Sequence, residues 1–178
     1  MITKIETMDQ LTKNLNLGPG HGGYLDLLKS IKLPESEWKR FVKWKDNRYT
    51  RNCISACDAY ELLLMCWKSG HQSPIHNYDF QESWIKVLKG QLIIEIYHVD
   101  RESGDCKLDE EVVINEKEYT YLNDNMGFHR VKNGSDEDTI SLHLNVEKVS
   151  QWEVFHECKK EFEIVEPRYD SFSNACID

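Results

Sequence analysis

The chain has 178 residues, of which 40% are hydrophobic and 30% charged, and its formal net charge at pH 7 is -9. This composition is typical of one soluble globular domain with a sizeable core. The acidic balance argues against nucleic-acid binding, which requires a basic surface. No apolar run approaches the roughly 20 residues that span a bilayer. We therefore expect neither a nucleic-acid partner nor a membrane partner.

The N-terminal segment is polar and has no apolar signal sequence, which favours a cytoplasmic location. The six cysteines include no CxxC pair and form no compact framework, so in a reducing compartment we expect free thiols. We also expect a monomer.

The first part of the chain is predicted to be helical and the rest to be β-rich. Residues 7–14 and 23–31 are predicted to form short helices, and Pro34 suits the first turn of a third. From residue 46 onward, short β-rich runs alternate with turn signals, which predicts an all-β sandwich or small barrel. The expected single domain, 1–178, then has a helical section at 1–45, a β-barrel at 46–166 and a loosely held tail at 167–178.

Turn and strand patterns add detail to the β-rich part. The sequence LKGQL predicts a tight hairpin with Gly90 in its turn, and residues 100–105 predict a longer hairpin tip. In SLHLNV, the polar side chains of Ser141, His143 and Asn145 share one side of a strand, and the leucines share the other. That polar side either meets water or lines the interior of a barrel, and the pattern leaves both alternatives open.

Two histidines occupy positions that suit a metal site. His76 and Tyr78, in GHQSPIHNYDFQESW, are two residues apart, so their side chains point the same way if the segment is extended. His129 follows a turn and is predicted at the start of another strand. Neutral imidazole is a common ligand for iron, copper and zinc, so the two histidines could converge on one ion. The alternative is that each is an ordinary structural histidine.

The spacing of the first of these segments resembles a cupin motif, Gly, His-x-His, Glu and Gly. The matching positions are Gly70, His76, Tyr78, Ser83 and Gly90, and a second cupin element resembles GFHRVKN, with His129 and Asn133. The chain as a whole resembles the cysteine dioxygenase family. The segments that carry this resemblance are EWKRFVKWKDNRYTRN, CWKSGHQSPIH, LKGQL, YLNDNMGFHRVKN and SLHL, and it covers roughly residues 23 to 158.

The resemblance implies an all-β cupin, a small barrel or jelly roll, preceded by short N-terminal helices. It also implies one mononuclear non-haem Fe(II) held by three histidines. The reactants would be O₂ and a small-molecule thiol, L-cysteine in the family, and the product would be the sulfinate. Iron allows O₂ to react, and holding thiolate and O₂ on one ion supplies proximity.

The resemblance assigns three residues to substrate binding. Arg51 matches the family's carboxylate-binding Arg, whose planar guanidinium can pair with a carboxylate through two hydrogen bonds. Tyr49 matches a Tyr that assists this Arg. Trp67 matches a Trp near the pocket and has an equally plausible packing role.

The same resemblance assigns residues to the metal and to catalysis. His76 and His129 match the first and third iron ligands. Ser141 and His143 match two members of a hydrogen-bonded Ser-His-Tyr row that lies next to the substrate.

Three positions depart from the family pattern. Tyr78 stands where the second histidine ligand is expected, and Asn145 stands where the Tyr of the row is expected. Ser83 stands where some members have a Cys crosslinked to that Tyr. We therefore expect no Cys–Tyr crosslink between positions 83 and 145. The loss of the Tyr also removes a proton donor beside the bound oxygen or thiolate.

Three accounts of Tyr78 remain open. It could bind the metal as a phenolate, which would favour Fe(III). It could stay protonated and line the pocket, leaving two histidine ligands. A nearby carboxylate, Glu82 or Asp79, could then complete a site of two histidines and one carboxylate. A regular strand would point Glu82 away from the metal.

Two functions compete. The first is a cysteine dioxygenase-like oxidoreductase, in which Tyr78 belongs to the metal and catalytic residues. The second is a degenerate cupin that binds a metal or a small carboxylate without turnover. The presence of Arg51, Tyr49 and His143 favours the enzyme, whereas the changes at 78 and 145 favour the binding protein.

Overall fold

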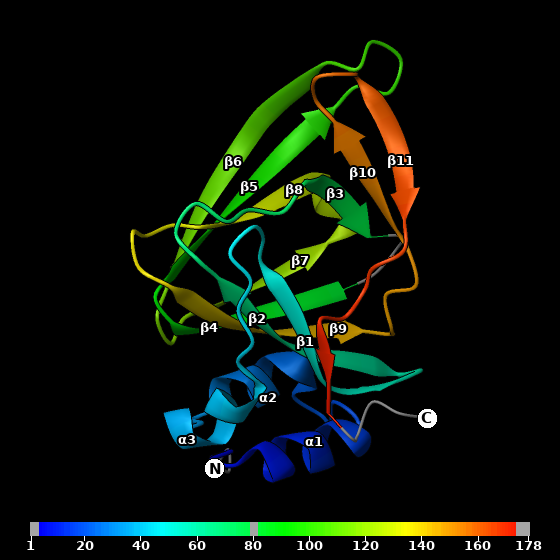
Figure 1. Cartoon of the computed structure of the whole chain (residues 1–178). Helices are drawn as coiled ribbons and strands as arrows, with labels where there is room; N and C mark the ends of the chain where they lie inside the picture. Colours follow the sequence, from blue (N-terminus) through cyan, green and yellow to red (C-terminus); the bar gives the residue numbers. More distant parts are fainter. Residues whose placement is uncertain (1–3, 79–81, 174–178) are drawn as a thin grey trace.

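The computed structural model describes residues 4–78 and 82–173 (Figure 1). Three short helices come first: α1 (Met8–Asn16), α2 (Gly23–Ser30) and α3 (Glu35–Trp38), which continues into the 3-10 turn η1 (Lys39–Phe41). The strands are β1 (Thr50–Cys57), β2 (Tyr60–Trp67), β3 (Ile75–Tyr78), β4 (Glu82–Lys89), β5 (Gln91–Val99), β6 (Cys106–Asn115), β7 (Tyr119–Asn123), β8 (Phe128–Asn133), β9 (Thr139–Val146), β10 (Trp152–His156), β11 (Glu161–Val165) and β12 (Ser171–Phe172), with a 3-10 turn, η2 (Asp124–Met126), before β8.

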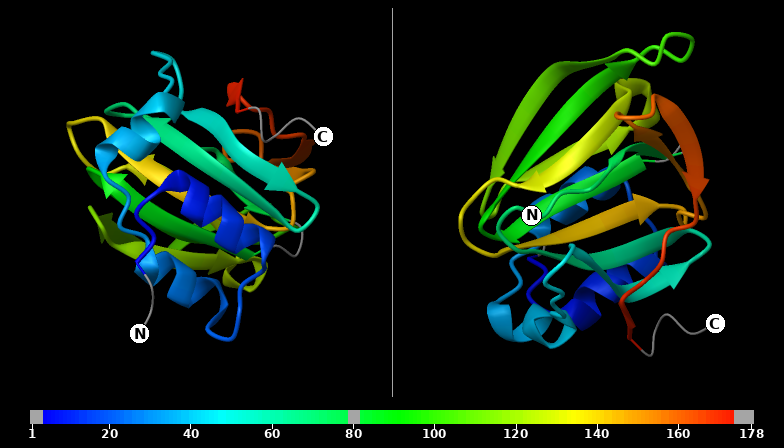
Figure 2. Two further views of the ribbon diagram at one scale, coloured as in Figure 1. Left: turned by 90° about the horizontal axis from the view of Figure 1, so that it is seen from below. Right: turned by 45° about the horizontal axis from the view of Figure 1, so that its top comes forward.

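The strands form two six-stranded sheets. Their orders are β12-β1-β2-β9-β4-β7 and β11-β10-β3-β8-β5-β6. The sheets face each other, and the helices lie against the outer side of the first sheet (Figures 1 and 2). The prediction of a cupin barrel preceded by short helices is confirmed.

Strand β2 explains how the layers are held together. All eight of its residues are buried, because one face meets the helices and the other faces the barrel interior. Leu62 and Leu64 pack with Leu11 and Leu15 of α1 in the outer core. The alternate residues of β2 join a second core inside the barrel, with Leu63, Met65 and Trp67 among its members. A strand that is covered on both faces is apolar along most of its length, so it lacks the alternation of apolar and polar residues that is typical of a strand with one exposed face.

The first helix has a sequence-encoded start. The Thr7 side chain accepts a hydrogen bond from the backbone of Gln10, and the Gln10 side chain accepts one from the backbone of Thr7, which forms a capping box. The helices predicted at 7–14 and 23–31 correspond to α1 and α2, within two residues at each end. Pro34 is the cap that precedes α3 rather than its first helical residue.

One of the two predicted hairpins is confirmed. Residues 100–105 connect β5 to β6, which pair antiparallel. Gly90 alone separates β4 from β5, and its φ of 80° lies in the left-handed region that favours glycine. The hairpin predicted here is wrong, however, because β4 and β5 belong to different sheets, and the tight turn passes the chain from one sheet to the other.

The end of the described chain differs from the loosely held tail that the sequence predicts. Strand β12 pairs in parallel with β1, with Asn52 opposite Ser171. Asp170 also forms ion pairs with Lys45 and Arg48. These partners lie more than a hundred residues away, so local composition gave no sign of the attachment. Residues 174–178 lie outside the described residues.

The cysteine prediction holds for four positions and fails at one. Cys57, Cys66, Cys106 and Cys158 are free thiols, whereas Cys53 is disulfide-bonded. Cys176 lies outside the described residues. In the described part of the chain, none of the helices has the length and apolarity needed to cross a membrane.

The tight turn at Gly90 gives a stability prediction. A Cβ at this position would lie 2.3 Å from Thr139 Oγ1 and 3.1 Å from its Cα, in addition to the positive φ. Gly18 has a similar φ of 87° but open space around it. We expect Gly90→Ala to lower the free energy of unfolding by at least about 1 kcal/mol more than Gly18→Ala. Urea unfolding of both variants measures this, and equal losses would contradict it.

Candidate active site

The polar face of β9 points into the barrel. Ser141, His143 and Asn145 are 0%, 3% and 2% exposed, while Leu142 and Leu144 on the other face pack with the helices. Of the two alternatives left open by the sequence, the structure therefore shows that the polar side of this strand lines the barrel interior and does not meet water. A buried row of polar side chains requires hydrogen-bond partners, and the interior supplies them.

His76 and His129 lie side by side on adjacent strands. They face each other directly in the pairing of β3 with β8, and their ring centroids are 4.3 Å apart. Both are almost fully buried, at 2% and 3% exposed. The ring of Trp152 meets His76 edge-on, with the centroids 4.9 Å apart.

These imidazoles are neutral, which is the form that binds metals. Burial lowers the pKa of His76 to about 4; the hydrogen bond to the Pro74 carbonyl opposes this shift, and the charge of Arg51 adds to it. Burial also holds the pKa of His129 well below its ordinary value, with further contributions from His76 and His143. His76 Nδ1 donates to Pro74 O over 2.9 Å, so the neutral ring carries its lone pair on Nε2.

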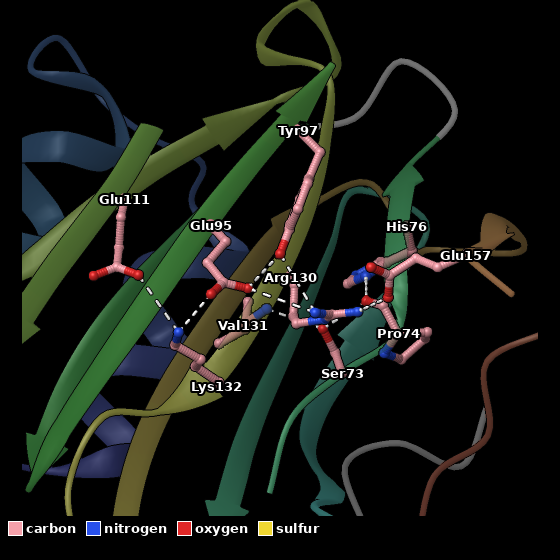
Figure 3. A network of polar contacts seen from close by, with 10 residues as sticks. All are labelled: Ser73, Pro74, His76, Glu95, Tyr97, Glu111, Arg130, Val131, Lys132 and Glu157. Carbon is pink, nitrogen blue, oxygen red and sulfur yellow. Dashed lines mark hydrogen bonds and ion pairs between the residues drawn. The ribbon is translucent and has the colours of Figure 1, made fainter. Parts of the chain in front are cut away.

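The segment before His76 is tied to the strand that carries His129 (Figure 3). Ser73 donates its backbone N–H to the carbonyl of Val131, and the Ser73 hydroxyl accepts from the Val131 N–H over 3.0 Å. These bonds keep β3 and β8 in register. The positions of the two histidines therefore depend on backbone contacts and not on the rings alone.

The opposite face of β8 carries a separate charged network (Figure 3). Glu95 accepts from Tyr97 over 2.7 Å and from Lys132, and Arg130 lies 3.8 Å away. Arg130 and Lys132 alternate with the inward-facing positions of β8, so this network lies outside the barrel interior.

Trp67, Ser141 and His143 form a hydrogen-bonded chain. Trp67 Nε1 donates to Ser141 Oγ over 2.9 Å, and Ser141 Oγ lies 2.9 Å from His143 Nε2. If Ser141 donates its hydroxyl proton to His143 Nε2, both the Trp67 N–H and the Ser141 O–H have an acceptor. Tyr49 stacks on Trp67 with the ring centroids 4.5 Å apart. Burial and then the charge of Arg51 lower the pKa of His143 to about 3.

Arg51 lies inside the barrel against a carboxylate that the sequence analysis did not identify. Its Nη2 is 3.2 Å and 3.4 Å from the two carboxylate oxygens of Glu61, and the side chains are 4% and 0% exposed. The sequence did contain a signal. Glu61 is the single charge in the apolar run YELLLMCW, and a buried charge requires a partner.

Glu61 has two further donors. Asn145 Nδ2 donates to Glu61 Oε2 over 2.5 Å, and the Tyr169 hydroxyl donates to Oε1. Burial and the charge of Glu61 raise the pKa of Tyr169, which keeps the phenol protonated as a donor. Tyr169 comes from the C-terminal segment, for which the sequence predicted no role.

Arg51 is also held by aromatic rings. Its guanidinium carbon lies 5.0 Å from the centroid of the Trp152 ring and 5.9 Å from that of Tyr169, which is within the range of a cation–π contact. Arg51 Nε is buried and has no hydrogen-bond partner among the described residues. A buried N–H without an acceptor is costly, so a ligand could satisfy it.

The backbone of Arg51 is fixed by Asp170. The Arg51 N–H donates to Asp170 Oδ2 over 3.0 Å, and the Asp170 N–H donates to the Arg51 carbonyl over 2.7 Å. Burial acts to raise the pKa of Asp170, but hydrogen bonds from Arg48 and Lys45 outweigh it and lower the pKa. The C-terminal segment therefore positions the strand that carries Arg51.

Ser83 and Asn145, two of the residues that depart from the family pattern, contact each other inside the barrel. Ser83 and Asn145 face each other across β4 and β9, and Ser83 Oγ donates to Asn145 Oδ1 over 2.8 Å. Glu82 is exposed, on the other face of β4, as a regular strand requires. The Tyr78 side chain and Asp79 lie outside the described residues, although the Tyr78 backbone pairs with Trp152.

Two of the described side chains are suitable ligands for one metal ion. His76 and His129 present neutral rings side by side, which suits a divalent transition metal. No cluster of three or more His, Cys, Asp or Glu that could hold an ion occurs within 4–78 and 82–173. A third protein ligand would therefore have to come from another residue type or from outside those ranges.

Sequence comparison gives the family. The model of the family described as cysteine dioxygenase type I matches residues 24–158, and the chain belongs to this family. Similar curated proteins include cysteine dioxygenase type 1 from Homo sapiens, 32% identical over 66% of this chain and 60% of the relative. The protein of the same name from Danio rerio is 34% identical over 67% of this chain and 61% of the relative. The matched region thus spans about three fifths of these relatives.

Solved structures with similar folds have low sequence identity. A protein from Thermus thermophilus, TT1209, is 14% identical with a TM-score of 0.49, over 61% of this chain and 92% of that chain. A cupin superfamily protein from Desulfitobacterium hafniense is 11% identical with a TM-score of 0.45, over 60% and 84%.

The contacts of Asp170 give a pH-dependent prediction. We expect Asp170→Asn to lower the free energy of unfolding by about 1–3 kcal/mol at pH 7, because charged hydrogen bonds to Lys45 and Arg48 weaken. A carboxylate with a lowered pKa stabilises the fold above its ordinary pKa of 3.8. The difference between variant and native protein should shrink as the pH falls below 3.8 and through the lower pKa that Asp170 has in the folded protein. Urea unfolding at several pH values measures this, with Asp136→Asn, an exposed site, as the control. A pH-independent difference would contradict it.

Proposed function

We propose that this protein is a cysteine dioxygenase-like oxidoreductase that oxidises the thiol of L-cysteine, or of a similar small thiol, to the sulfinate. The reaction would consume O₂ at a mononuclear non-haem iron. The observation that carries the proposal is the pair of buried, neutral histidines, His76 and His129, held side by side in a chain of the cysteine dioxygenase family.

In this proposal His76 and His129 hold the iron, and Tyr78 is the third candidate ligand. When bound, the iron supplies the chemistry that lets O₂ and a thiolate react with each other. The burial of both imidazoles keeps them deprotonated at neutral pH, so protons do not compete with the metal.

The remaining residues would orient the substrate. Arg51 offers a buried Nε donor to an acceptor group on the substrate. Tyr49 stacks on Trp67 and keeps its indole N–H directed at Ser141. Ser141 in turn holds the His143 ring through Nε2, so a proton on Nδ1 is the one that His143 can donate.

A second candidate is a cupin that binds a metal or a small ligand without turnover. The contacts of Asn145 favour it. Its amide donates to Glu61 and accepts from Ser83, so both ends are engaged. An amide also titrates at no physiological pH, so this position cannot deliver the proton that the family's Tyr would supply.

Metal binding is the first test. We expect the native protein to bind Fe(II) under anaerobic conditions and His129→Ala to bind it at least about tenfold more weakly, because loss of a ligand costs more than loss of an outer partner. His98→Ala, at an exposed position of β5, is the matched control and should bind like the native protein. Calorimetric titration with Fe(II) measures all three. Equal affinities of native protein and His129→Ala would refute the proposed ligand set.

Oxygen uptake separates the two candidates. We expect the Fe(II)-loaded protein to consume O₂ in the presence of L-cysteine or another small thiol and to form the sulfinate, followed with an oxygen electrode and mass spectrometry. Tyr78→His, which restores the family's second histidine, is the comparison. If only this variant turns over, the native protein is the binding protein and the enzyme proposal is wrong.

A further inference from the structure

We propose that a cavity outside the barrel, between the end of α2 and strand β4, binds a small organic anion, namely a carboxylate with a short aliphatic chain. The charged end of this ligand would meet the ammonium of Lys86. Lys86 alternates along β4 with Ile85 and Val87, which belong to the core inside the barrel. Its side chain therefore faces away from the interior, and this inference does not rest on the proposed oxidoreductase function.

The cavity has both a charged and an apolar lining. Its volume is about 230 Å³, many times the space that one water molecule requires. The lining side chains are three lysines and several apolar groups, among them Lys32, Lys86, Lys117, Ile31, Leu33 and Leu88. Within the described chain, no carboxylate is part of this lining. A ligand that carries a carboxylate on a short apolar chain matches both kinds of surface.

Lys86 is a buried cation that no carboxylate of the described residues pairs with. It is 5% exposed, and its Nζ donates to the carbonyl oxygens of Leu28 and Lys117, each over 3.3 Å. A lysine is seldom buried to this extent unless an anion accompanies it. Arg51, another buried cation, has such a partner in Glu61.

The neutral contacts of Lys86 explain only part of this arrangement. Leu28 lies in the last turn of α2, where the helix carbonyls favour a cation. The centroid of the Tyr119 ring lies 5.5 Å from Lys86 Nζ, within the range of a cation–π contact. An ammonium group has three donors, however, and the two carbonyls accept only two of them. A donor and an uncompensated charge therefore remain for a ligand.

The surrounding charges favour an anion at this place. Burial first, and then the charge of Lys32, lower the pKa of Lys86. A carboxylate in the cavity would oppose both effects, because it gives the ammonium a counter-charge at short range. Lys117 Nζ lies 3.3 Å from the exposed carboxylate of Glu116, so Lys32 and Lys86 supply most of the attraction.

Hexanoate, hexanamide and acetate are matched probes for this cavity. Hexanamide has the chain without the charge, and acetate has the charge with only a methyl group. We expect calorimetric titration of the metal-free protein to show saturable binding of hexanoate. Hexanamide should bind at least about tenfold more weakly for lack of charge, and acetate likewise for lack of apolar surface to bury. Removal of metal beforehand keeps the carboxylates from binding an ion inside the barrel.

The variant Lys86→Met removes the charge and keeps a long unbranched side chain. We expect it to bind hexanoate at least about tenfold more weakly and hexanamide unchanged, because the neutral probe does not use the ammonium. Lys89→Met is the matched control, since Lys89 belongs to the same strand but lies outside the cavity lining. Thermal unfolding gives a second readout: excess hexanoate should raise the Tm of the native protein and of Lys89→Met, but not that of Lys86→Met.

Three results would overturn the inference: no saturable binding of hexanoate, equal binding of hexanamide or acetate, and full affinity for hexanoate in a folded Lys86→Met. If that variant does not fold, as judged by circular dichroism, Lys32→Gln at an exposed position takes its place. It should weaken hexanoate binding at least about twofold, and an unchanged affinity would then overturn the inference. Oxygen uptake with small thiols tests the proposed function separately.

Discussion

The constraint on which the rest of the structure depends is that one sheet is covered on both faces. The helices bury the outer leucines of β2 and β9, so the alternate residues of those strands must face the barrel interior. In β9 these are polar side chains, and in β2 they include Glu61. The hydrophobic effect thus forces a charged and hydrogen-bonding row into a place where each group requires a partner. The polar centre is a consequence of how the helices pack.

The barrel interior deals with its charges in two ways. The histidines are kept neutral by burial, whereas Arg51 and Glu61 are placed against each other as an ion pair. A buried pair of this kind gives little net stability, because desolvation offsets the attraction. Its value is geometric: the pair fixes where the guanidinium lies and which of its N–H groups remains available.

The sequence predicted those features that depend on local patterns or on recognisable motifs. The first two helices, the tight turn at Gly90 and the barrel built from short β-rich runs are of this kind. The sequence did not show that the chain changes sheets at Gly90, because strand pairing depends on distant partners. The resemblance placed His76 and His129 on positions that the structure brings together. The contacts of Glu61 with Tyr169 and of Arg51 with Asp170 join segments more than a hundred residues apart, and no local pattern encodes such pairings.

The C-terminal segment has a consequence for the order in which the protein is made. A ribosome synthesises the histidine strands and Arg51 well before residues 169 and 170. Until residues 169 to 172 emerge, Glu61 lacks its phenol donor and the strand of Arg51 lacks its edge partner. The nascent barrel can therefore assemble its two cores first, while the polar centre is completed only after this later segment has been synthesised.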